Sequence, residues 1–213
     1  MPTRPLLLLG NGRFAVEALE IAEAAGFSPL GFVNSLTRPD KGATLEGFPV
    51  FWVDEIKAAP GDCEVACAIV TTRRLPFIEL MASRGYRFVS LVHPFTNLSK
   101  RARIGTGCII NAGTVVGSNA VLADHAVVNR GALIGHDVVI GYGCTIGPGA
   151  NIAGNVEIGD GAFIAQGAVI LEGIRIGKGA VVGAGALVRN DVAANDMVMG
   201  VPAKVVRSGV NGL

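Results

Sequence analysis

Residues 134–158 read IGHDVVIGYGCTIGPGANIAGNVEI, and an aliphatic side chain returns at every sixth position of this stretch. The spacing runs without an insertion through fifteen consecutive hexads, from Ile104 to Val188. Four residues after each aliphatic position stands a small or β-branched residue, from Cys108 to Val192. A period of six fits neither an α-helix nor a heptad repeat. It predicts short strands joined by tight turns, which glycine and asparagine favour.

Three such hexads make one triangular coil, so the chain returns to the same face after eighteen residues, at a strand spacing of about 4.8 Å. The hexads therefore predict about five coils of a left-handed parallel β-helix, in a domain that we place at residues 95–213. The flat faces of such a prism expose backbone and apolar surface, which closed association around a threefold axis would cover. Prisms of this kind usually associate in this way, so the expectation of a homotrimer rests on the behaviour of such proteins as much as on physics.

The first 94 residues follow a different pattern, which predicts a Rossmann-like βαβ domain. A strand at 5–9 is followed by the turn Gly10-Asn11-Gly12 and by a helix that ends near Ala25. The further elements that we expect are strands at 29–33, 65–70 and 88–92 and a helix at 75–84.

The turn at residues 10–12 resembles half of a dinucleotide-binding fingerprint, with Ala15 in place of the third glycine. It either binds an anion at the helix N-terminus or only reverses the chain. NAD is not expected, because Asn34 and Ser35 stand where an acidic residue would hold the ribose.

Composition argues against several classes of partner. Eighteen basic and seventeen acidic side chains give a net charge of +1, without the basic stripe of a protein that binds nucleic acid or anionic membranes. The apolar run at residues 6–9 is too short to span a bilayer and has no signal-peptide cleavage site after it. The four cysteines lack CxxC spacing, and we expect reduced thiols. These features favour a cytoplasmic protein without nucleic acid or membrane partners.

His136 is the candidate general base, since histidine is the usual one near neutral pH. It is the third residue of its hexad, and Gly154 is the third residue of the hexad eighteen positions later. The two should therefore lie one coil apart on the same face. In acyl transfer, His136 would take a proton from the attacking group, and the Gly154 amide would stabilise the oxyanion. Asp137 would favour the charged imidazole. The alternative is that His136 is only a solvated turn residue.

The other histidines suggest less chemistry. We expect His125 to be structural or peripheral, and His93 to mark the domain junction. Some β-helices are zinc carbonic anhydrases, which need three converging histidines, two of them closely spaced. The eleven residues between His125 and His136 do not suit such a site, so no metal is expected.

With these residues assembled, the chain resembles the bacterial hexapeptide-repeat sugar acetyltransferases, a family of nucleotide-amino-sugar N-acetyltransferases and sialic acid O-acetyltransferase relatives. The resemblance covers nearly the whole chain. It is carried by the turn at 10–12, by IGHD at 134–137, by residues 148–156 and by GVPAK at 200–204. The last motif recurs among many enzymes that use acetyl-CoA.

The resemblance implies a role for each matching position. It implies that His136 is the base, that Asp137 increases its basicity and that the Gly154 amide holds the thioester carbonyl. The positions implied for acetyl-CoA are Thr145, Gln166 and Ala184, in a groove between neighbouring prisms, together with Pro202 and Lys204 of the ending motif. The positions implied for the acceptor in the first domain are Gly12, Arg13, Phe14, Asn34, Ser35 and Thr71.

The chain departs from the family pattern in three places. Relatives often have glycine and histidine where this chain has Arg13 and Phe14, and paired aspartates where it has Asn34 and Ser35. Thr145 replaces a histidine of some members. The first two departures concern the acceptor, and the third concerns contacts to acetyl-CoA.

The expected activity is acetyl-CoA-dependent N-acetylation of a nucleotide-linked amino-deoxy-sugar, by direct attack and without a metal. One alternative is O-acetylation of a sialic-acid-like sugar by the same machinery. A second is a non-catalytic trimeric binding module, which the presence of His136 disfavours.

Overall fold

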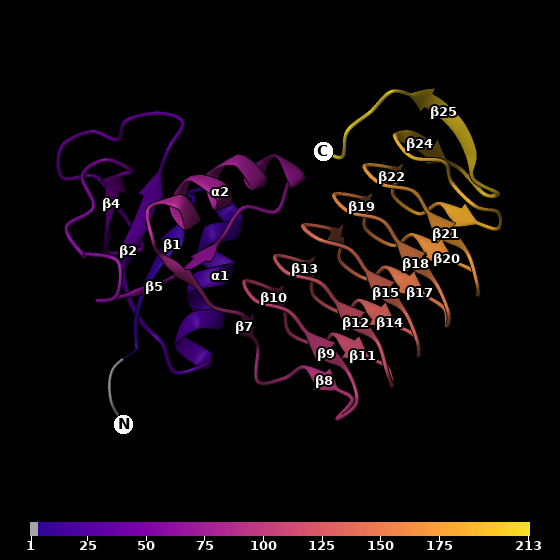
Figure 1. Cartoon of the computed structure of the whole chain (residues 1–213), viewed down its shortest axis with the longest axis horizontal. Coiled ribbons are helices and arrows are strands. Elements are labelled where there is room, and N and C mark those ends of the chain that lie inside the picture. Colours follow the sequence, from indigo (N-terminus) through magenta and orange to yellow (C-terminus); the bar gives the residue numbers. More distant parts are fainter. Residues whose placement is uncertain (1–3) are drawn as a thin grey trace.

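A triangular prism of stacked coils forms the larger part of the molecule, and a smaller α/β domain lies against one of its faces (Figure 1). The structure is a computed structural model, and it describes residues 4–213. The prism is the left-handed β-helix that the hexads predict. None of the helices in the described residues is long and apolar enough to cross a lipid bilayer.

The prism has three sheets, and successive coils pair in parallel with a register of eighteen residues, as in Val115 with Leu133. The first sheet contains β7 (Leu91–Val92), β10 (Ile109–Ile110), β13 (Val127–Val128), β16 (Thr145–Ile146), β19 (Phe163–Ile164), β22 (Val181–Val182), β24 (Asp196–Met199) and the antiparallel β25 (Lys204–Ser208). The second contains β8 (Asn97–Leu98), β11 (Val115–Val116), β14 (Leu133–Ile134), β17 (Asn151–Ile152), β20 (Val169–Ile170) and β23 (Leu187–Val188). The third contains β9 (Arg103–Ile104), β12 (Val121–Leu122), β15 (Val139–Ile140), β18 (Glu157–Ile158) and β21 (Arg175–Ile176).

Both halves of the hexad pattern point into the prism. The aliphatic residues from Ile110 to Val188 are at most 2% exposed, and the small residues from Cys108 to Ala168 are fully buried. An aliphatic and a small side chain alternate around each coil, and together they form the apolar core of the prism. All four cysteines are buried and free, as expected.

The prism begins earlier than predicted. We expected one strand at 88–92, but β6 (Arg87–Phe88) and β7 belong to different sheets. The Val89 amide still bonds the first domain at Val65, whereas the Leu91 amide bonds the prism at Cys108. The predicted boundary between residues 94 and 95 therefore lies inside the first coil.

The first domain has one six-stranded sheet with the order β3-β4-β2-β1-β5-β6. Its strands are β1 (Pro5–Leu9), β2 (Ser28–Asn34), β3 (Thr44–Leu45), β4 (Phe48–Trp52), β5 (Glu64–Cys67) and β6. Its helices are α1 (Arg13–Ala24), the 3₁₀ turn η1 (Thr72–Arg74) and α2 (Leu75–Ser83). The sequence did not reveal the hairpin β3–β4, because β3 is two residues long and β4 contains Pro49.

Helix α1 lies between this sheet and the prism. Its apolar face packs in one cluster with the outward side chains of Leu91, Ile109 and Val127 from the first prism sheet, which are at most 1% exposed. At the edge of the contact between α1 and the prism, Glu17 accepts hydrogen bonds from Asn111 at 3.1 Å and from Arg130 at 3.2 Å. The first domain is therefore fixed on the first sheet, while the other two sheets face outward.

Neighbouring residues of β15 test how much the interior contributes to stability. Because Ile140 is fully buried, Ile140→Ala should lower the free energy of unfolding by about 2–5 kcal/mol in urea titrations at fixed protein concentration. Val139 is 44% exposed, so Val139→Ala should change it by about 0.5 kcal/mol or less. Equal losses for the two variants would contradict an interior built by the hexad pattern.

Candidate active site

His136 stands on the corner between the second and third sheets, in the turn after β14. Its Nδ1 lies 2.9 Å from Oδ2 of Asp137, and its side chain is 58% exposed. Asp137 reaches the ring because its backbone is left-handed, with a φ of 55°. With Nδ1–H donating to the carboxylate, Nε2 keeps its lone pair and can accept a proton.

Asn119, one coil before Asp137, completes a chain of three side chains. Its Nδ2 donates to Oδ1 of Asp137 at 3.0 Å, so each carboxylate oxygen has one partner. The hydrogen bonds from His136 and Asn119 lower the pKa of Asp137 from its ordinary value. Asn119 is not among the residues predicted from the sequence, although it stands eighteen residues before Asp137, one coil earlier.

Gly154 lies beside the His136 ring, one coil further on, as the spacing predicted. A Cβ added to Gly154 would stand 2.6 Å from both Cε1 and Nε2 of His136, so only glycine leaves room for the ring. The Gly154 N–H donates no hydrogen bond within residues 4–213. A base and a free amide donor are thus adjacent, which is the pair that acyl transfer requires.

Four of the positions expected for acetyl-CoA lie near the corner between the first and second sheets. Gln166 and Ala184 are exposed on successive coils, linked through the Gly185 amide and the Gln166 carbonyl at 3.0 Å. Pro202 and Lys204 are exposed in the segment after β24, and the amide of Ala203 between them donates to the carbonyl of Leu187 in β23. Within one chain, the outer face of the second sheet separates this corner from His136.

Thr145 has a different environment. It is fully buried in β16, where its hydroxyl donates to the Val70 carbonyl and accepts from Arg74, both at 2.8 Å. Its side chain is therefore not open to a ligand in this conformation. The guanidinium that binds it was not anticipated from the sequence.

The positions expected for the acceptor gather at the carboxyl ends of β1, β2 and β5. Gly10 is required there, because a Cβ would lie 2.7 Å from Ile69. Gly12 is not required by packing or by its φ of −83°, so its missing side chain leaves the start of α1 open. Arg13 is exposed, whereas Phe14 packs on the core of the domain.

The remaining acceptor positions are half-buried at the same sheet edge. The Asn34 side chain accepts a hydrogen bond from the Leu36 amide at 3.0 Å, which orders the turn after β2. Ser35 follows it, and Thr71 stands just before η1.

His125 packs between aromatic side chains of the two domains. Its ring packs edge-on against Phe88 and Tyr142, with centroids 4.7 and 5.5 Å away. Burial lowers its pKa. Among residues 4–213, no three His, Cys, Asp or Glu side chains come close enough to hold a metal ion.

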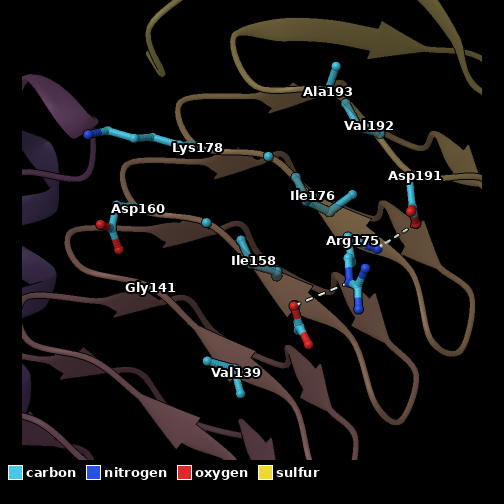
Figure 2. Close-up of a pocket in the computed structure, with 13 residues that line it drawn as sticks. Val139, Gly141, Ile158, Asp160, Arg175, Ile176, Lys178, Asp191, Val192 and Ala193 are labelled. Atoms are coloured by element: carbon cyan, nitrogen blue, oxygen red, sulfur yellow. Dashed lines mark hydrogen bonds and ion pairs between the residues drawn. The ribbon is translucent and has the colours of Figure 1, made fainter.

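A groove of about 860 Å³ crosses the outer face of the third sheet (Figure 2). Arg175 pairs there with Glu157 at 3.4 Å, and its amide bonds Asp191 at 2.8 Å. None of the predicted site residues lines this groove, so it is separate from the candidate active site.

Asn119 and Asn155 offer a matched test of the hydrogen bonds that link Asn119, Asp137 and His136. Both have left-handed backbones on the same corner, but the Asn155 amide bonds Glu172 instead of Asp137. We expect Asn119→Gly to raise the Asp137 pKa toward its ordinary value, and Asn155→Gly to leave it unchanged, in carboxyl ¹³C NMR titrations. In the native protein, the ionised carboxylate should keep its bonds above the ordinary pKa and lose them as the pH falls through the lowered value. Unchanged titration of Asp137 in Asn119→Gly would contradict the assignment.

Known proteins share both the repeat and the two-domain arrangement. The family described as "Bacterial transferase hexapeptide (six repeats)" matches residues 137–171 and 155–190. Perosamine N-acetyltransferase from Caulobacter crescentus, solved as a histidine mutant with CoA and GDP-perosamine, is 27% identical over 96% of this chain and 97% of that chain, with a TM-score of 0.86.

Two further solved structures cover the chain as fully. The acetyltransferase domain of PglB from Neisseria gonorrhoeae FA1090 is 31% identical over 96% of this chain and 100% of that chain, with a TM-score of 0.87. It has also been solved in complex with acetyl coenzyme A. WeeI from Acinetobacter baumannii AYE is 29% identical with the same coverage and TM-score. No curated protein matches the sequence.

Three observations point to the same family: the hexapeptide repeat, the α/β domain on the first sheet and full-length similarity at up to 31% identity. The chain belongs to the bacterial hexapeptide-repeat sugar acetyltransferases.

Proposed function

We propose that the protein transfers the acetyl group of acetyl-CoA to the amino group of a nucleotide-linked amino-deoxy-sugar. The observation that carries the proposal is the His136 ring, which pairs with Asp137 and lies beside Gly154, whose N–H donates no hydrogen bond within residues 4–213. Similar proteins support the two substrates, since one was solved with acetyl-CoA and another with CoA and GDP-perosamine.

In the proposed reaction, the sugar nitrogen attacks the thioester carbonyl carbon, and His136 Nε2 accepts the proton that the amine releases. A C–N bond forms, the Gly154 N–H stabilises the oxyanion, and the C–S bond then breaks. The imidazolium returns the proton to the departing CoA sulfur. Asp137 keeps the ring oriented and stabilises its charged form.

Direct attack is supported by the state of the cysteines. An acyl-enzyme formed on a cysteine would need a thiolate nucleophile. Burial raises the pKa of Cys67 and Cys144 to about 12 and that of Cys108 to about 11. Cys63 is also buried, and burial raises its pKa. All four side chains are therefore protonated at neutral pH and closed to substrate.

We propose that three chains share their active sites. The second sheet carries the His136 corner along one edge and the Gln166 corner along the other. If this sheet faces a threefold axis, each His136 corner meets the Gln166 corner of the next chain, because cyclic interfaces join unlike surfaces. The outward side chains of this sheet include Val115 and Leu133, which are 39% and 44% exposed and would be covered.

The first domain would hold the acceptor in this arrangement. Glu17 of α1 bonds Arg130 on the same corner as Gln166, so the open start of α1 belongs to the side where the donor is expected. Gly12, Arg13, Asn34, Ser35 and Thr71 would contact the nucleotide sugar. Acetyl-CoA would lie along Gln166, Ala184, Pro202 and Lys204.

Thiol release from acetyl-CoA tests the activity. The panel comprises GDP-, UDP- and dTDP-linked 4-amino and 3-amino sugars, GDP-perosamine among them, with the hydroxyl sugars as comparison. We expect turnover on an amino sugar, and a loss of about 10²–10⁴-fold in kcat for His136→Ala. Turnover on hydroxyl sugars alone would replace N- with O-acetylation. Turnover that His136→Ala leaves intact would refute the assigned base.

Mixing of variants tests the shared site. His136→Ala removes the base, and Ala184→Trp fills the expected donor groove on the opposite edge of the second sheet. Each variant alone should be inactive. After joint refolding of equal amounts, about one quarter of the sites should combine an intact base with an intact groove from the next chain. A mixture as inactive as its components would place both functions within one chain, and sedimentation would show whether trimers form.

A further inference from the structure

A nearly completely buried guanidinium lies where the first domain meets the prism. Arg74, the last residue of η1, is 1% exposed and is the largest fully buried side chain of residues 4–213. No carboxylate in this part of the chain forms an ion pair with it. Burial lowers its pKa, yet an arginine remains protonated at neutral pH.

The guanidinium bonds both domains at once. Nη1 donates to the Val70 and Thr71 carbonyls at 3.2 and 2.9 Å, on the loop that follows β5. Nη2 donates to three carbonyls of the prism corner between the third and first sheets, each at 2.9 Å. These belong to His125, Gly143 and Cys144.

Two threonines strengthen the same junction. The Thr145 hydroxyl, in the prism, accepts from Arg74 and donates to Val70 in the loop. On the other side of the loop, the Thr72 amide and hydroxyl bond the Leu213 carbonyl at 2.6 and 2.8 Å. The adjacent Gly212 amide bonds Gly179 of the prism. The loop is thus held from two directions.

The loop at residues 68–73 forms one side of the expected acceptor site. It lies against the turn after β1, where Gly10 leaves just enough room for Ile69, and it contains Thr71. We propose that Arg74 is a positioning residue, which with Thr145 fixes this loop on the prism and so sets where the acceptor sits relative to the prism. The part that concerns the acceptor rests on the proposed function.

The chemistry of the junction explains why an arginine is used. Apolar side chains can join two surfaces at less desolvation cost than a buried charge. Their contacts are not directional, however, whereas a planar guanidinium with five donors fixes several carbonyls in one geometry. A lysine ammonium is a single point with three donors and cannot span the same set.

The test compares Arg74→Met, Arg74→Lys and Thr145→Val with Arg84→Met. Arg84 is a matched control, because it bonds Val53 and Asp54 inside the first domain and makes no hydrogen bond to the prism. Hydrogen exchange reports on residues 68–75. Steady-state kinetics give separate KM values for acetyl-CoA and for the amino sugar that the wild-type protein acetylates.

We expect Arg74→Met to raise both exchange in the loop and the KM for the amino sugar by roughly tenfold, with the KM for acetyl-CoA unchanged. Arg74→Lys and Thr145→Val should show smaller changes in the same direction, and Arg84→Met none. If Arg74→Met does not fold, Thr145→Val carries the test. Unchanged exchange at 68–75, or equal increases in both KM values, would overturn the proposal. Hydrogen exchange is measured without substrate. It therefore tests whether Arg74 fixes the loop on the prism even if no amino sugar is acetylated.

Discussion

The eighteen-residue register between successive coils is the constraint on which the rest of this structure depends. An aliphatic wedge and a small residue fill the prism at every hexad, so a shift of the register would bring a turn residue into the interior. Because the register is fixed, residues eighteen apart become neighbours about 4.8 Å apart, and each corner of the prism becomes a set of columns. The fold itself therefore places side chains from different coils side by side.

Two corners of the prism carry different columns of residues eighteen positions apart. On the corner between the second and third sheets, Asn119, Asp137 and Asn155 repeat a left-handed turn, and the first two hold His136 in orientation. Gly154 is small because the imidazole occupies the space that a side chain would need. The corner between the first and second sheets instead presents Gln166 and Ala184, which are exposed on successive coils. Within one chain the second sheet separates the two corners, and the proposed trimer is the arrangement that would bring them together.

The first domain depends on the prism for its placement. Apolar side chains of α1 pack against the first sheet, while Glu17 and Arg74 form hydrogen bonds to the prism on either side of these contacts. The buried guanidinium has only neutral partners, which makes the junction directional without an ion pair. Thr145 shows how this arrangement changes the role of a residue, since its hydroxyl serves the junction.

The sequence alone predicts the prism, because a period of six fits neither an α-helix nor a heptad repeat. It also predicts that Gly154 lies beside His136, because the register brings residues eighteen positions apart together, whereas Asp137 simply follows His136 in the chain. It also indicated the βαβ character of the first domain. Only the tertiary structure decided where the prism starts, since the hydrogen bonds change partner between Val89 and Leu91 without any sign in the residues. It likewise revealed the hairpin at β4, hidden by Pro49, and the contacts of Arg74. The contacts of Arg74 with the prism join residues 51 to 71 positions apart through no repeat, and only the packing of the two domains brings them together.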